Sequence, residues 1–130
     1  MNTVTEEAIV TGSPEDVWTL ITEPLHFQKW YAFGGASIDL RPGGDITMRW
    51  DEHGEFQAVV EAVTPAKLIS FRWRPEPGPL VTITLESAGP GKTHVRIVES
   101  GELEDLKQSA LAWRNGLSLL TELAISRKTD

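Results

Sequence analysis

Few side chains in this sequence combine the type and the spacing that catalysis requires. The histidines His26, His53 and His94 lack the His-x-His or His-Glu-x-x-His spacing that brings two imidazoles to one metal ion. No carboxylate is evident that would orient any of them as a general base. The chain has no cysteine and no Gly-x-Ser-x-Gly elbow, so thiol, zinc-thiolate and serine-elbow chemistry lack support. The sequence therefore predicts no catalytic residue, no metal site and no cofactor.

One glycine-rich stretch, Gly89-Pro90-Gly91-Lys92-Thr93, has the ending of a phosphate-binding loop. That motif needs a glycine where this chain has Glu86 and a helix after the threonine, whereas the residues that follow alternate like a strand. A dinucleotide fingerprint fails as well, because His94 stands at the third glycine position. We interpret the stretch as a hairpin turn.

Aromatic and large apolar side chains are the more informative set. Five tryptophans in 130 residues is a high number, and broad rings are typical of the walls of an apolar pocket. Rings also fill ordinary cores, so pocket lining and plain packing both stay open for each one. The candidate ligand-binding residues are Trp30, Phe33, Met48, Trp50, Phe71, Trp73, Trp113 and Leu117.

The charge balance limits the partners. A net charge of -7 would repel a nucleic-acid backbone, and no apolar run reaches the roughly 20 residues of a membrane span. The N-terminal residues lack the layout of a signal peptide. We expect a cytoplasmic protein with no nucleic-acid partner.

The elements that would position these residues follow from hydrophobic periodicity. β-branched residues predict a first strand over 4–10, and alternation predicts six more over 36–40, 46–50, 55–64, 67–73, 80–86 and 93–99. Short turns join these six in series, which predicts that they are antiparallel. Ser13 as N-cap and Pro14 at the first position predict a short helix after the first strand, and Pro24 separates it from a second one. Alternation also directs Arg49 and Arg72 away from the Trp50 and Trp73 side, while any charge that points inward, such as Glu99 or Arg96, would need a partner.

Beyond Gly101 the apolar residues recur every three or four positions, which predicts one long amphipathic helix. Its stripe comprises Leu103, Leu106, Ala110, Trp113, Leu117, Leu120 and Ala124. We expect Leu106, Trp113, Leu117 and Leu120 to be buried on the sheet, while Glu104, Gln108 and Arg114 lie on the polar side. Gly116 in the interior of this helix costs about 0.5–1 kcal/mol relative to alanine. Close approach of a strand would explain it, and room for a ligand is the alternative.

Three segments, together with this order of elements, resemble the START-like helix-grip superfamily and its branch of activators of the heat-shock protein 90 ATPase. They are Ser13-Pro14-Glu15-Asp16-Val17-Trp18 at the helix entry, Arg41-Pro42-Gly43-Gly44-Asp45 at a turn, and the strand-Pro-strand segment 61–73, which ends in Trp73. The resemblance implies a single α+β domain over residues 1–130. In it, a curved antiparallel sheet of about seven strands grips a long C-terminal helix, and two short helices follow the first strand.

The resemblance implies a protein that binds a small hydrophobic, aromatic or lipid-like molecule in a cavity between the C-terminal helix and the sheet. An enzyme of the polyketide-cyclase kind is the alternative, since such enzymes need little more than a shaped cavity and one acid or base. A module that interacts with a chaperone is the third class. The absence of a catalytic set favours binding over catalysis, and a homodimer stays open.

Overall fold

The computed structural model of the chain describes residues 2–50, 52, 54–75, 78–102 and 106–129. His53, Leu103 and Glu104, which the sequence placed in a turn and on the long helix, lie outside the described residues.

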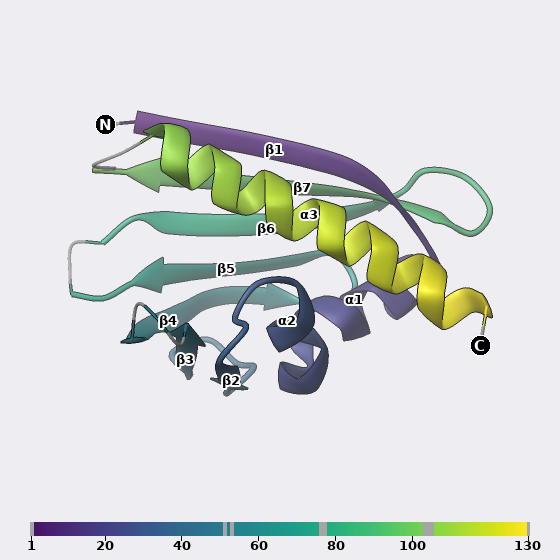
Figure 1. The fold of residues 1–130 in the computed structure, drawn as a ribbon. Helices are drawn as coiled ribbons and strands as arrows, with labels where there is room; N and C mark the ends of the chain where they lie inside the picture. Colours follow the sequence, from purple (N-terminus) through teal and green to yellow (C-terminus); the bar gives the residue numbers. More distant parts are fainter. Residues whose placement is uncertain (1, 51, 53, 76–77, 103–105, 130) are drawn as a thin grey trace.

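Seven strands form one curved antiparallel sheet in the order β1-β7-β6-β5-β4-β3-β2 (Figure 1). Only the β1–β7 neighbours depart from a simple meander, because the first strand returns to pair with the last from Asn2 opposite Gly101 to Thr11 opposite Lys92. The predicted antiparallel meander of the strands that follow the two short helices is confirmed, with small shifts at the strand ends. The strands are β1 (Asn2–Thr11), β2 (Gly35–Ile38), β3 (Asp45–Trp50), β4 (Gly54–Thr64), β5 (Leu68–Trp73), β6 (Leu80–Ser87) and β7 (Lys92–Gly101).

The strands alternate between a buried and a polar face, as the period of two predicted. On β7 the side chains of Val95 and Ile97 are fully buried, whereas Arg96 between them is exposed. A bulge between Val60 and Ala62 interrupts the β4–β5 register, and such bulges bend a strand. Arg49 and Arg72 point outward to Glu55 and Glu61, at 2.9 and 2.6 Å between the Nε and carboxylate oxygen atoms, as predicted.

Three helices lie on the buried face of the sheet: α1 (Pro14–Thr22), α2 (Pro24–Trp30) and α3 (Leu106–Thr129). The Ser13 hydroxyl accepts the backbone N–H of Asp16 at 3.2 Å, so the predicted N-cap is confirmed. Figure 1 shows α3 crossing in front of β1, β7 and β6, with α1 and α2 on the same side of the sheet. None of the helices in the described ranges is both long and apolar enough to cross a membrane.

The buried stripe of α3 begins later than the sequence predicted. Trp113, Leu117 and Leu120 are at most 3% exposed, as expected, but Leu106 is 43% exposed. The expectation for Leu106 was wrong because this residue occupies the first turn of the helix, almost two turns before Trp113, the first fully buried side chain on it.

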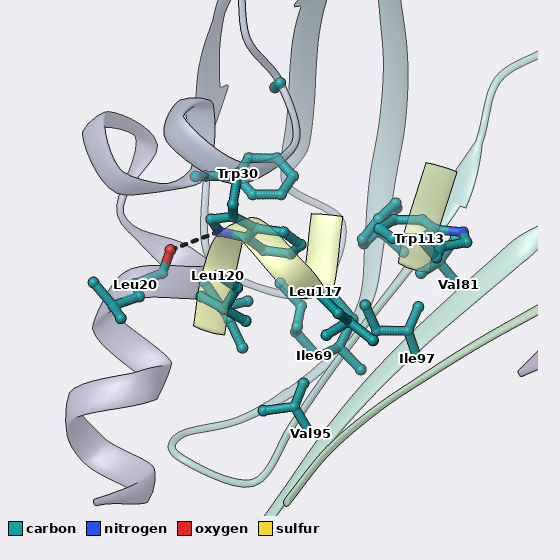
Figure 2. Packing of buried hydrophobic residues seen from close by; sticks show 14 of the residues in the cluster. Leu20, Trp30, Ile69, Val81, Val95, Ile97, Trp113, Leu117 and Leu120 are labelled. Carbon is teal, nitrogen blue, oxygen red and sulfur yellow. Dashed lines mark hydrogen bonds between the residues drawn. The ribbon is translucent and has the colours of Figure 1, made fainter. Parts of the chain in front are cut away.

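The core also contains the indole of Trp30, which joins all three helices. Figure 2 shows this ring between Leu20 of α1 and Leu117 and Leu120 of α3, with its N–H directed at the Leu20 carbonyl oxygen, 2.9 Å away. The ring therefore fixes α2 against its neighbours and, with it, the segment that follows α2.

Candidate functional site

A cavity of about 420 Å³ opens where the end of α2 faces α3. Its volume lies within the range typical of small-molecule sites. Among the described residues that line it, none carries a charge. The lining residues are Trp30, Tyr31, Phe33, Trp50, Phe56, Gln108, Ala112, Asn115 and Gly116.

Five aromatic rings form one wall of the cavity: Trp30, Tyr31, Phe33, Trp50 and Phe56. Contacts with one another fix three of them, Tyr31, Trp50 and Phe56. The Trp50 indole donates its N–H to the backbone carbonyl oxygen of Tyr31 at 2.7 Å. The Trp50 ring also forms T-shaped contacts with the rings of Tyr31 and Phe56, with centroids 5.1 and 5.7 Å away. Phe33 and Phe56, at 56% and 42% exposed, reach toward the solvent. The wall is thus rigid at Tyr31 and Trp50 and open at its outer end.

The opposite wall is one face of α3, formed by two small residues and two carboxamides. This face comprises Gln108, Ala112, Asn115 and Gly116. Ala112 lies four residues after Gln108, three before Asn115 and four before Gly116, and such spacings place residues on the same side of a helix. The absence of a side chain at Gly116 has a direct cause. A Cβ atom there would lie 3.3 Å from both the ring and the carbonyl oxygen of Trp30. Close approach by α2, rather than by a strand, explains this glycine, and the glycine also borders the cavity.

Behind the aromatic wall lies a buried carboxylate. Glu99 on β7 is 7% exposed, and its two oxygens accept the indole N–H groups of Trp73 and Trp113 at 2.8 and 3.0 Å. The ring of Trp113 stacks on Tyr31 with centroids 4.1 Å apart and planes 9° from parallel. Burial, and secondarily the nearby charge of Glu99, raises the pKa of the Tyr31 hydroxyl well above its usual value of 10.0. Tyr31 is therefore neutral at physiological pH.

The predicted site residues separate into two groups. Trp30, Phe33 and Trp50 line the cavity. Met48, Phe71, Trp113 and Leu117 are buried in the core, and Trp73 is half-buried on β5, so none of these five contacts the cavity described here. A direct ligand contact for them stays a prediction.

Six lining residues were not among the predicted ligand-binding residues, although the sequence left room for a ligand open at one of them, Gly116. Phe56 could have been found, because it stands two positions before Ala58 and four before Val60, which are buried on the inward side of β4. Tyr31 could not, since its position depends on how the chain leaves α2. Gln108 was predicted on the polar side of the helix. Ala112, Asn115 and Gly116 could have been found from their helical spacing after Gln108, which places all four on one side of the helix.

No group of three or more His, Asp or Glu side chains in the described part of the chain lies close enough to hold a metal ion. Within these ranges the site offers aromatic surface, two carboxamides and a phenol rather than metal ligands.

A curved antiparallel sheet gripping a long C-terminal helix is the helix-grip fold of the START-like proteins. Residues 11–124 match the family model described as Activator of Hsp90 ATPase homolog 1-like protein, so the chain belongs to that family. Among curated proteins none matches this sequence.

Solved structures agree with this assignment. A protein of Mesorhizobium loti is 26% identical, with 99% of each chain covered and a TM-score of 0.82. The Aha1 dimer of Colwellia psychrerythraea is 20% identical over 95% of this chain and 96% of that one, with a TM-score of 0.83. CalU16 of Micromonospora echinospora is 18% identical over 93% of this chain and 73% of that one, with a TM-score of 0.78. The likenesses to the second and third show the fold alone.

The buried hydroxyl of Tyr31 predicts a loss of stability in alkali. A pKa raised in the folded state means that folding favours the protonated phenol. This stabilisation is complete below about pH 10, the unfolded value, and is lost as the pH rises toward the folded value. Urea midpoints of the wild type should therefore fall as the pH rises above about 10, and Tyr31→Phe should reduce that fall. Because Tyr31 is the chain's only tyrosine, phenolate absorbance reports on it alone. Ionisation at the ordinary pH without any unfolding would contradict the prediction.

Proposed function

We propose that the protein binds small, uncharged aromatic molecules in the cavity between the aromatic wall and α3. The observation that carries the proposal is an uncharged hollow of about 420 Å³ with five aromatic rings along one side. Flat apolar ligands gain from ring stacking and from the release of water, and the small side chain of Ala112 leaves room for them on the α3 side.

The carboxamides of Gln108 and Asn115 give the cavity its polar side. They can donate to and accept from a ligand oxygen or nitrogen without requiring a charge. A charged ligand would lose its hydration in a site that offers no ionic partner among its described lining residues. We therefore favour neutral ligands that carry hydroxyl or carbonyl groups at the edge of their rings.

Catalysis of the polyketide-cyclase kind is less well supported. Glu99 is the buried acid that such an enzyme would need, but it does not line the cavity, and each of its oxygens already accepts an indole N–H. Tyr31 does line the cavity, but the raised pKa of its hydroxyl keeps it protonated at neutral pH, so it offers no base, and makes it a weak proton donor.

The chaperone-binding alternative rests on the family description and would require an exposed apolar surface. Phe33 and Phe56 are the exposed rings at the cavity, and the same rings serve the ligand proposal. The Colwellia structure is of a dimer. A homodimer of the present chain is likewise a proposal, which sedimentation equilibrium tests.

Two matched probes test the binding proposal. Neutral N-phenyl-naphthylamine should bind at one site and quench tryptophan fluorescence, because Trp30 and Trp50 line the cavity. Its sulfonated counterpart, anilinonaphthalene sulfonate, should bind at least about tenfold more weakly, since its charge would be desolvated without a partner. Native mass spectrometry of the purified protein would then identify a ligand that it retains. Equal affinity for both probes, or no quenching by the neutral one, would contradict the proposal.

A further inference from the structure

Glu99 is a buried carboxylate whose hydrogen-bond partners are unusual. A buried carboxylate is costly unless it is paired or hydrogen-bonded. Within the described part of the chain no basic side chain forms an ion pair with Glu99. Its two hydrogen bonds instead come from indoles on two different elements, Trp73 on β5 and Trp113 on α3. The carboxylate therefore ties the long helix to the middle of the sheet.

From Glu99 a continuous series of contacts leads to the cavity. Trp113, held by its N–H, offers its ring face to Tyr31 in a nearly parallel stack. Tyr31 forms part of the cavity wall and accepts the Trp50 N–H through its backbone carbonyl. Trp50 in turn forms a T-shaped contact with Phe56 at the outer end of the wall. The orientation of Trp113 thus fixes the ring that a ligand would contact.

We propose that Glu99 is a positioning residue of the cavity: by holding the indoles of Trp73 and Trp113 it sets the plane of the Tyr31 ring and hence the shape of the aromatic wall. The inference rests on the proposed function in so far as that wall contacts a ligand. Glu99 itself is not among the residues that line the cavity.

The chemistry of the site requires a carboxylate rather than a carboxamide. Two N–H donors converge on Glu99, and a carboxylate presents an acceptor oxygen to each. Glu99→Gln preserves the shape but turns one oxygen into an NH₂ group, which faces an indole donor and cannot accept it. One indole must then move away, and displacement of Trp113 would shift Tyr31.

The test compares Glu99→Gln with Trp73→Phe and with the double variant. Glu99→Gln should weaken binding of N-phenyl-naphthylamine by about tenfold while far-UV circular dichroism stays unchanged. Trp73→Phe removes one donor and should bind within about threefold of the wild type. In the double variant the carboxamide oxygen is free to accept Trp113 alone, so affinity should recover toward that of Trp73→Phe. Glu86→Gln, at an exposed site on β6, is the matched control.

A second readout needs no ligand. Nuclear Overhauser contacts between the rings of Tyr31 and Trp113 should weaken in Glu99→Gln and return in the double variant. If the wild type binds neither probe but these contacts change as expected, the proposed function fails and the positioning role stands. If Glu99→Gln keeps both the contacts and the affinity of Glu86→Gln, or if the double variant is as impaired as Glu99→Gln, the positioning role is overturned. Should Glu99→Gln not fold, Glu99→Asp, which keeps both oxygens but withdraws them by one methylene, is expected to give the same losses.

Discussion

Trp113→Ala is expected to lower the free energy of unfolding by about 3–5 kcal/mol, the range for removal of a fully buried aromatic side chain. Trp113 is 1% exposed, stacks on Tyr31 and donates to Glu99. The substitution leaves a void between α3 and the sheet, and it also removes one of the two donors that compensate a buried carboxylate. Urea denaturation followed by circular dichroism measures the loss.

Trp50→Ala provides the comparison. Trp50 is half-buried, lines the cavity and donates its N–H to the backbone carbonyl oxygen of Tyr31 in the same wall. We expect it to destabilise the protein by roughly 1–2 kcal/mol, while its effect on probe affinity is larger than its effect on stability. Equal losses for the two variants would mean that Trp113 borders an open space rather than the packed core.

Most of the helices and strands could be predicted from patterns that span only a few residues, such as alternation along a strand and capping at a helix start. Alternation along β7 predicts which of its side chains are buried, and Ser13 with Pro14 predicts where α1 begins. Leu106 shows the limit of such rules. The helical period continues through it, but burial depends on where α3 comes to lie over the core, which the periodicity of a single segment does not specify.

The site was predicted less completely, because it depends on which rings face each other across elements. Rings at Trp30, Phe33 and Trp50 could be selected by residue type alone. Tyr31 depends on the path of the chain after α2. The sequence predicts that an inward-pointing Glu99 needs a hydrogen-bond partner. It does not predict which residues provide one, because the partners come from β5 and α3, far apart in the sequence.

Ala112→Phe is expected to weaken binding of N-phenyl-naphthylamine by at least about a hundredfold while leaving the protein folded. Ala112 is exposed on α3 and borders the cavity between Gln108 and Asn115, so a benzyl group there can turn into the hollow without displacing core atoms. The lower helix propensity of phenylalanine costs less than about 1 kcal/mol.

Ser118→Phe is the matched control for this variant, because it adds the same ring to an exposed position of α3 that is not among the cavity's lining residues. It should keep the affinity of the wild type, since an added apolar side chain matters only where it occupies the space of the ligand. Fluorescence titration of both variants, with melting temperatures measured alongside, separates occlusion from unfolding. If Ala112→Phe binds the probe as tightly as Ser118→Phe, the ligand sits elsewhere. The open groove lined by Pro14, Pro65 and Lys67 would then be the next surface to substitute, and the aromatic wall beside α3 would serve packing alone.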